Sequence, residues 1–292
     1  MPHPPEPAAQ RRALCRQLRQ ARLLATYTQD GASTALGWSI AKLLRIEAGT
    51  VGLSPTDLRA LLDLYGVRGV QVRRRLEAMA RLARREPWAA FRDVLSPQER
   101  SYLANEGAAS QLRQYECVLI PELLRTEGYA RTVINALALP GTAPQVLQRR
   151  LEACLARQAI LDRDDPPQLR FVVDEAALLR LANCDRIIGS GQVERLHELA
   201  DHPAVSLQIL PLAVGLHGGL AGSFVLLDFP DPADASLLDR AGRTRPVLTA
   251  TDQVAVYGRV FADLAAAASP PHMVHTILDQ IMPRLPAEEM SR

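Results

Sequence analysis

Residues 29–49, QDGASTALGWSIAKLLRIEAG, constrain the fold of this chain more than any other stretch. The pattern predicts a first short helix over Gln29–Leu36 and a second over Ile40–Ala48, joined at Gly37. Glycine adopts positive φ at little steric cost, so Gly37 can turn the chain sharply. Ser39 then stands where a side-chain oxygen can accept the unpaired N–H groups that begin the second helix. The result is two helices that cross at a turn of a few residues.

Two helices crossing at a glycine-containing turn form a helix-turn-helix, and the second helix of such a motif is shaped to enter the major groove of DNA. Base edges there are read mainly by polar side chains such as Arg, Asn and Gln. The obvious polar candidates of the second helix are Ser39, Lys42 and Arg45, and we expect base contacts from them. Gln29, which begins the first helix, joins these candidate DNA contacts.

Charge is distributed unevenly along the chain. Residues 1–90 carry 15 Lys or Arg against 7 Asp or Glu, a formal charge of +8, and the remainder carries 19 against 25, or −6. A basic first third on an acidic body fits a nucleic-acid-binding head. A solvated arginine face would give the same charge, and RNA would be attracted as well as DNA. We expect phosphate contacts from arginines of the first and fifth helices of the head, including Arg12, Arg73, Arg74 and Arg75.

Apolar spacing predicts five helices in the head. Ser54-Pro55 opens the fourth as N-cap and first-turn proline, and the fifth spans Val70–Arg85. Glu86-Pro87-Trp88 then breaks the pattern and marks the expected boundary. We expect a disordered proline-rich arm at residues 1–8, a helix-turn-helix domain at 9–86, a larger domain at 87–285 and a tail at 286–292.

The rest of the chain mixes helices with strands. The predicted fold class is therefore α+β, an all-α helix-turn-helix head of about five helices followed by a larger mixed α/β domain. The glycine-rich link 215–222 follows a strand and leads into another strand, so we expect a hairpin connection there rather than a phosphate-binding loop. The main expected segments are a helix from Ser96-Pro97 to Leu112 and strands at Tyr115–Leu119, Leu169–Val173, Val205–Leu210 and Ser223–Phe229.

Several motifs resemble known families. Thr28-Gln29, Leu36-Gly37-Trp38-Ser39 and Arg45-Ile46-Glu47-Ala48-Gly49 resemble the phage-repressor-like, XRE-type helix-turn-helix domain. Downstream, VLIPELLRTEGYAR (118–131), ARQAIL (156–161), VVDEAALLR (172–180) and the stretch 205–234 resemble the sensor-like, antitoxin-like DUF5753 domain found in many XRE-type regulators of high-GC bacteria. The resemblance covers roughly residues 10–268.

This resemblance implies a cytoplasmic transcriptional regulator that binds double-stranded DNA as a homodimer. It further implies a partner for the larger domain, either a small acidic protein or a small-molecule effector, and no association with membranes. The second helix departs from the family, because Ile40, Ala41, Leu43 and Leu44 stand where such regulators usually carry several polar side chains. An alternative therefore stays open, in which the head no longer reads DNA, or binds RNA, and the larger domain binds or transforms a small metabolite.

The resemblance also singles out a candidate ligand pocket in the larger domain. Arg157, Gln158 and Glu175 belong to its motifs, and His217 lies in the glycine-rich link, where backbone can approach a ligand closely. The competing interpretation is a structural or dimerising domain in which Arg157 and Glu175 form a buried ion pair. The sequence contains no Ser-His-Asp, metallohydrolase or nucleotide-binding signature, and we expect no catalytic residues and no cofactor.

The remaining candidate ligating residues are scattered. The four cysteines lie far apart without CxxC spacing, which predicts free thiols in a reducing cytoplasm. His272 and His275 are three residues apart but have no carboxylate or cysteine partner in sequence, so we expect no metal site. No apolar run approaches the ~20 residues needed to cross a bilayer.

Overall fold

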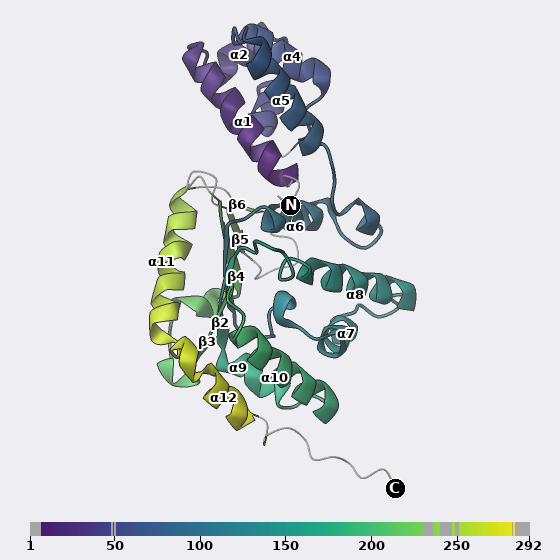
Figure 1. Cartoon of the computed structure of the whole chain (residues 1–292), viewed down its shortest axis with the longest axis vertical. Helices are drawn as coiled ribbons and strands as arrows, with labels where there is room; N and C mark the ends of the chain where they lie inside the picture. Colours follow the sequence, from purple (N-terminus) through teal and green to yellow (C-terminus); the bar gives the residue numbers. More distant parts are fainter. Residues whose placement is uncertain are drawn as a thin grey trace. The chain divides into compact units, whose positions relative to one another are not determined.

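The computed structural model describes residues 7–47, 49, 51–229, 236–239, 247–248, 251–281 and 283. They belong to two compact units, Met1–Ala90 and Phe91–Arg292, which are treated separately below (Figure 1). The first helix begins at Pro7, so the last two residues of the expected disordered arm are helical. Proline is tolerated there because the N–H groups of a first helical turn have no helical partner. The rest of the arm and the expected tail at 286–292 lie outside the described residues.

The N-terminal unit is a helical bundle, which confirms the expected all-α head. Its buried core combines Leu14 and Leu18 of the first helix with Leu43, Leu58 and Leu62 from two later ones. Apolar residues three or four positions apart lie on one helix face, and that face is the one each helix buries. The helices are α1 (Pro7–Leu24), α2 (Gln29–Ala35), α3 (Ile40–Glu47), α4 (Pro55–Leu64) and α5 (Val70–Ala83).

The turns of this unit follow the expected local chemistry. The Thr28 hydroxyl accepts the Gly31 N–H at 2.9 Å and caps α2. Gly37 has φ of +65° between α2 and α3, in the left-handed region that glycine tolerates best. The Ser54 hydroxyl accepts the Asp57 N–H at 3.0 Å and caps α4, as its sequence predicts. The sharp turn of the helix-turn-helix therefore rests on Gly37, as expected.

The larger unit is built on a mixed sheet, which confirms the expected α+β class. In the described residues the strand order is β3-β2-β1-β4-β5-β6. β1 is parallel to β2 and β2 to β3, whereas β4, β5 and β6 are each antiparallel to the strand before them in this order. The strands are β1 (Gln111–Glu116), β2 (Gln168–Asp174), β3 (Val205–Leu210), β4 (Phe224–Asp228), β5 (Ser236–Asp239) and β6 (Val247–Leu248).

Helices cover both faces of this sheet (Figure 1). α11 lies along one face, where Phe261 and Leu264 pack against Tyr115, Val172 and Phe224. The crossover helices between the parallel strands lie over the opposite face. The α-helices are α6 (Pro97–Gly107), α7 (Glu127–Ala136), α8 (Pro144–Gln158), α9 (Glu175–Leu181), α10 (Arg186–Ala200), α11 (Thr251–Ala267) and α12 (Val274–Ile281). Short 3-10 helices are η1 (Ala89–Phe91), η2 (Glu122–Leu124), η3 (Leu212–Val214), η4 (Gly218–Ala221) and η6 (Pro271–Met273).

Three sequence expectations for this unit are wrong. The glycine-rich link does not form a hairpin, because β2 and β1 lie between β3 and β4 and the link carries the chain past both of them. The strand expected at Tyr115–Leu119 is β1 at Gln111–Glu116, and α6 ends at Gly107 instead of reaching Leu112. Three of the six β1 residues are Gln or Arg. Because of these polar residues, the sequence does not show the apolar run expected of a strand buried between two neighbours.

Candidate functional site

The exposed face of α3 carries the candidate base contacts at its two ends. Leu43 and Ile46 face the core, with at most 3% of their surface exposed, whereas Ser39 and Arg45 are exposed. The Ser39 hydroxyl accepts the Lys42 N–H at 3.3 Å, so it begins the helix as expected. Arg45 Nε donates to the Ala41 carbonyl at 3.1 Å and lies along the helix surface. The helix therefore shows one short and one long polar side chain to solvent.

Lys42, the third candidate for base contact, is already engaged within the unit. Its Nζ lies 2.8 Å from Asp57 Oδ1 of α4 and 3.8 Å from the centroid of the Trp38 ring. An ammonium over an aromatic face and beside a carboxylate is stabilised by both. A base contact from Lys42 stays a prediction, and it requires the ammonium to leave Asp57.

A buried network fixes the angle between the helices of the motif. Glu47, the last residue of α3, accepts from Arg22 Nε at 2.6 Å and from Arg22 Nη2 at 3.1 Å. Gln29 Nε2 donates to the same carboxylate at 2.7 Å, and Arg22 Nη1 donates to the Tyr27 carbonyl at 2.8 Å. The hydrogen bond to Glu47 raises the pKa of Arg22. Gln29, predicted as a DNA contact, thus joins α2 to the end of α3.

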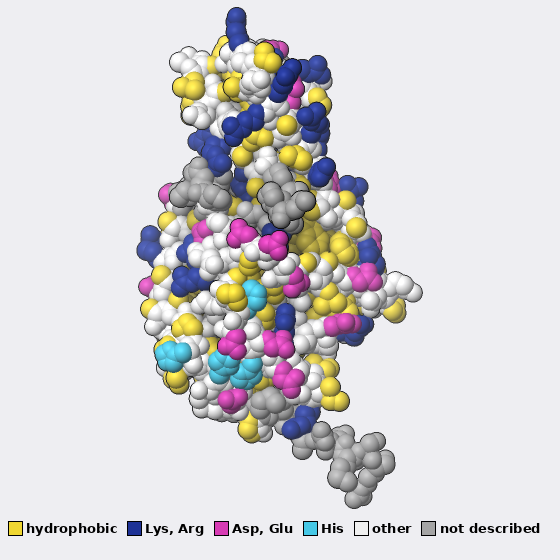
Figure 2. Space-filling view, viewed as in Figure 1, with side chains coloured by type: hydrophobic (Ala, Val, Ile, Leu, Met, Phe, Trp, Pro, Cys, Tyr) yellow, Lys and Arg dark blue, Asp and Glu magenta, His cyan; other side chains and the backbone are white. Residues whose placement is uncertain are grey.

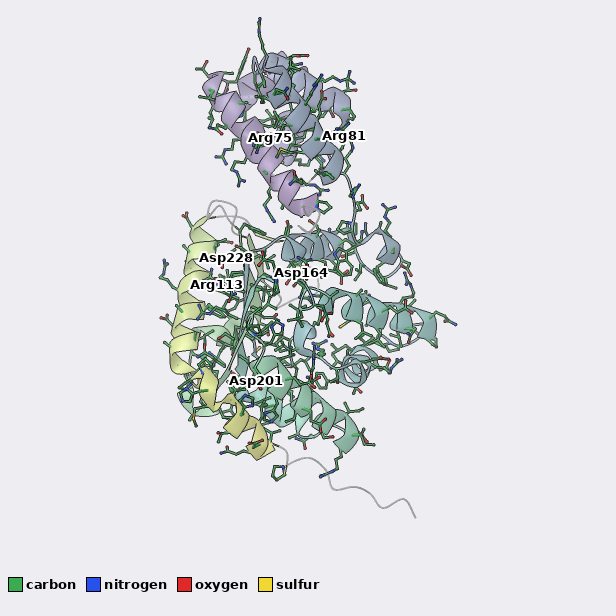
Figure 3. All side chains as sticks on the ribbon, in the orientation of Figure 1. Arg75, Arg81, Arg113, Asp164, Asp201 and Asp228 are labelled. Atoms are coloured by element: carbon green, nitrogen blue, oxygen red, sulfur yellow. The ribbon has the colours of Figure 1, made fainter. Side chains whose placement is uncertain are left out.

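The candidate phosphate contacts differ in their surroundings. Arg73 donates to the Val67 carbonyl at 2.5 Å and pairs with Asp63, so it holds the connection between α4 and α5. Arg12 is half-buried on α1, whereas Arg74 and Arg75 are exposed on α5. Figure 3 labels Arg75 and Arg81 on this helix, and in Figure 2 dark blue side chains are spread over the visible face of the unit.

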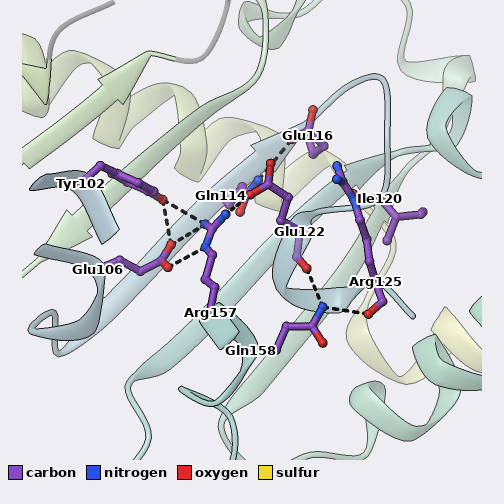
Figure 4. Close-up of polar contacts among 9 residues, drawn as sticks. All are labelled: Tyr102, Glu106, Gln114, Glu116, Ile120, Glu122, Arg125, Arg157 and Gln158. Atoms are coloured by element: carbon purple, nitrogen blue, oxygen red, sulfur yellow. Dashed lines mark hydrogen bonds and ion pairs between the residues drawn. The ribbon is translucent and has the colours of Figure 1, made fainter. Parts of the chain in front are cut away.

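The larger unit encloses a buried polar cluster around Arg157 (Figure 4). Arg157 of α8 donates from Nε to Glu106 Oε1 at 2.6 Å and from Nη2 to Glu106 Oε2 at 2.5 Å. It also pairs with Glu122, and the Tyr102 hydroxyl donates to Glu106 Oε2 at 2.9 Å. Burial acts to lower the pKa of Arg157, but Glu106, Tyr102 and Glu122 outweigh it and hold the pKa well above its usual value. With 4% of its surface exposed, Arg157 is a structural cation.

Two amide side chains, one half-buried and one buried, hold the segment that follows β1. Gln158 Nε2 donates to the carbonyls of Glu122 at 2.9 Å and Arg125 at 2.8 Å. Gln192, which is fully buried, donates to the Leu124 carbonyl at 2.8 Å and accepts the Thr126 N–H at 2.8 Å. Buried carbonyls and N–H groups need such partners because they have lost water. The sequence motifs 118–131 and 156–161 are therefore in contact and complete each other's hydrogen bonds.

Comparison with known families agrees with the division of the chain into an N-terminal unit and a larger unit. A helix-turn-helix domain model matches residues 13–76, which span most of α1 to α5. A model for a domain of unknown function, DUF5753, matches residues 99–280, more than half of the chain. The chain belongs to the DUF5753 family. No curated protein matches it, and no solved structure does.

In the DUF5753 domain, His217 lies against the ends of β1 and β2. Its Nδ1 accepts the Gly219 N–H at 3.2 Å, and its Nε2 lies 3.8 Å from Asp174 Oδ2. The Tyr115 hydroxyl donates to the same Asp174 oxygen at 3.1 Å. Burial raises the pKa of Tyr115, and the neighbouring Asp174 raises it further. His217 thus fastens the glycine-rich link to the sheet.

The predicted pocket residues of the DUF5753 domain do not converge. Arg157 lies on the side of the sheet covered by the crossover helices, whereas His217 lies beside Tyr115 on the side covered by α11. Glu175 accepts the Leu212 N–H at 2.9 Å at the start of α9. The alternative pairing of Arg157 with Glu175 is wrong as well, because among the described residues Arg157 forms its ion pairs with Glu106 and Glu122.

A surface groove lies elsewhere in the DUF5753 domain, between α7 and α8. Its volume is about 290 Å³, close to the lower limit of small-molecule pockets. None of the four predicted pocket residues lines it. The lining residues are Arg131, Ile134, Asn135, Pro144, Leu147, Gln148 and Leu151.

The histidine of α12 is engaged inside the DUF5753 domain. His275 Nδ1 lies 2.7 Å from His197 Nδ1 of α10, and His275 Nε2 lies 3.0 Å from Asp201 Oδ1. This contact joins α12 to α10. Among the described residues of the chain, no helix is both long and apolar enough to span a membrane.

Sequence reasoning missed the partners that hold the candidate residues in place. Lys42 donates to Asp57, and Gln29 donates to Glu47. Arg157 donates to Glu106. Glu47 stands inside the motif Arg45-Ile46-Glu47, where a carboxylate on a short apolar helix could have suggested a buried partner. Glu106 gives no local signal, because its partner lies 51 positions away.

Proposed function

We propose that this chain is a cytoplasmic, XRE-type bacterial transcriptional regulator that binds double-stranded DNA as a homodimer. The observation that carries the proposal is the helix-turn-helix itself. α2 and α3 meet at Gly37 with φ of +65°, and the matched helix-turn-helix domain covers both helices. The second helix of this motif is the one that enters the major groove.

The roles of individual residues follow from their surroundings. We assign base-facing positions to Ser39 and Arg45, which are exposed at the two ends of α3. Arg74 and Arg75 are exposed on α5 and suit phosphate contacts, in which position matters more than base sequence. Arg73 instead supports the α4–α5 connection through Asp63.

The DUF5753 domain is proposed to sense a small-molecule effector or a small acidic protein. The groove between α7 and α8 supports this role, since it combines apolar lining with a few polar groups such as Arg131 and Gln148. Leu137 and Leu139, which follow α7 in the chain, are 52% and 67% exposed and are further apolar side chains at the surface. Exposed apolar patches next to polar groups are typical of interaction sites.

Selection from random duplex DNA tests the DNA-binding proposal. The full chain should enrich a reproducible sequence, and two copies of that sequence in inverted orientation would support the homodimer. Arg45→Ala should weaken binding to the enriched sequence, whereas Arg131→Ala in the larger unit should leave binding unchanged. Failure to enrich any sequence at low salt would sink the proposal.

A further inference from the structure

The middle of α3 presents an apolar surface to solvent. Ile40 and Leu44 are 45% and 43% exposed, and they lie on one helix face because they are four residues apart. Ala41 is also exposed on this helix. The core is supplied separately by Leu43 and Ile46, so the outward apolar residues are not needed to anchor the helix.

The apolar residues Ile40 and Leu44 lie between the two exposed polar residues of this surface, Ser39 and Arg45. Lys42 is drawn away from it by Asp57 and Trp38. Ser39 lies at the first end of the helix, where its hydroxyl accepts the Lys42 N–H. Between Ser39 and Arg45, a groove-facing helix of this kind offers methyl and methylene groups, and Arg45 adds a guanidinium group near its end.

The charge of the unit points to the partner of this surface. Residues 1–90 carry a formal charge of +8, with Arg19, Arg74 and Arg75 among the exposed residues. A second copy of the unit would bring the same charge and be repelled, whereas duplex DNA brings a dense negative charge. In the major groove of DNA, the thymine 5-methyl group is the apolar feature that side chains can read.

We propose, on the basis of the DNA binding proposed above, that Ile40 and Leu44 contact thymine 5-methyl groups and make the protein select thymine at those positions. The two residues are about 6 Å apart along the helix, which is nearly two steps of about 3.4 Å along a DNA strand. The contacted thymines therefore lie within about two base pairs of each other in each half-site. A-form RNA has no such methyl groups, and its major groove is too narrow for side chains to read.

Replacement of thymine by uracil in the enriched DNA sequence tests the inference, because uracil lacks only the 5-methyl group. Binding is measured by fluorescence anisotropy with the full chain at one salt concentration. Loss of one contacted methyl should weaken wild-type binding roughly fourfold, and loss of two about tenfold or more. The Ile40→Ala/Leu44→Ala variant should bind the thymine and uracil duplexes within about twofold of each other, since its alanines no longer reach the methyl groups.

Val70→Ala is the matched control. Val70 is 62% exposed at the start of α5, away from α3, and its variant should keep the wild-type preference for thymine. Equal wild-type affinity for both duplexes, or an enriched sequence without thymine, would overturn the inference and leave DNA binding intact. Absence of any enriched sequence would overturn both. If the wild type is an oligomer that Ile40→Ala/Leu44→Ala dissociates in sedimentation, the apolar face joins protein copies and the inference is also overturned.

Discussion

Replacement of Arg157 by methionine should destabilise the larger unit without acting on a ligand site. The substitution keeps much of the side-chain length but removes the guanidinium, and Glu106 is then left 2% exposed without its cation. Of the contacts described for this carboxylate, the Tyr102 hydroxyl at 2.9 Å would remain. Breaking a buried pair from one side costs about 3–5 kcal/mol, a large share of the roughly 5–15 kcal/mol that holds a domain folded.

A double-mutant cycle separates the free energy of the Arg157–Glu106 ion pair from a general loss of packing. Glu106→Gln/Arg157→Met removes both charges, so its decrease in stability should be smaller than the sum of the two single decreases by about 1–3 kcal/mol. Arg131→Met is the matched control, because the ion pair of Arg131 with Glu127 is exposed. The control should be destabilised by less than about 1 kcal/mol.

Urea unfolding of the full chain by circular dichroism gives the free energies of unfolding, and hydrogen exchange of peptides from β1 and α8 assigns the transition to the larger unit. The expected result is earlier unfolding of Arg157→Met, with partial recovery in the double variant. A change below about 1 kcal/mol, combined with an abolished effector response, would refute the structural assignment and return Arg157 to a ligand site.

Other outcomes follow from the same structure. Glu47→Ala should destabilise the N-terminal unit by about 3 kcal/mol in thermal unfolding, since it leaves a buried arginine unpaired. The sequence-based prediction for Lys42 is tested by Lys42→Ala, which weakens DNA binding mainly at the preferred sequence if the ammonium leaves Asp57 to contact a base; unchanged selectivity would assign Lys42 to its contacts within the unit. Gly219→Ala should cost about 1–3 kcal/mol, because a Cβ there would lie 2.5 Å from the Tyr115 ring. Burial raises the pKa of Tyr65 from 10.0 to about 12. The free energy of unfolding of the N-terminal unit should therefore be retained below about pH 10 and fall between about pH 10 and 12. Tyrosinate absorbance and unfolding measured across this range would show it.

The helical head could be predicted from sequence because its signals are local. Gly37 supplies the positive φ and Ser54-Pro55 supplies the cap, and each acts on residues a few positions away. The apolar period of α1, α4 and α5 then gives the buried face directly. Helix boundaries differ from expectation by a residue or two, as frayed ends usually do.

The sheet topology depends on pairings that no local pattern contains. β4 pairs with β1, which lies more than a hundred residues earlier, and Arg113 binds Asp228 through two hydrogen bonds of 2.8 Å across that pair (Figure 3). The glycine-rich link was compatible with either a hairpin or a longer crossing. Only the strand order shows that it crosses, with Gly219 against the Tyr115 ring.

The sequence selected the candidate site residues by their side-chain type, but it did not indicate the partners that hold them. Resemblance selected Arg157 and Gln158, and the structure places Arg157 in the interior and Gln158 half-buried beside it, where they stabilise α6 and η2. Lys42 and Gln29 were chosen as polar residues of the motif, and carboxylates on other helices hold them. Partners of this kind are distant in sequence, so residue type alone cannot separate a binding side chain from a structural one.

The central claim is that the N-terminal unit binds DNA through its exposed arginines, and the salt dependence of binding tests it most directly. Affinity of the full chain for its enriched duplex should fall steeply with salt on a double logarithmic plot. Arg74→Gln/Arg75→Gln should reduce the slope by about one unit for each phosphate that is no longer neutralised, with Arg131→Gln as the unchanged control. Salt-insensitive binding, or the same slope in the variant and the wild type, would contradict the claim.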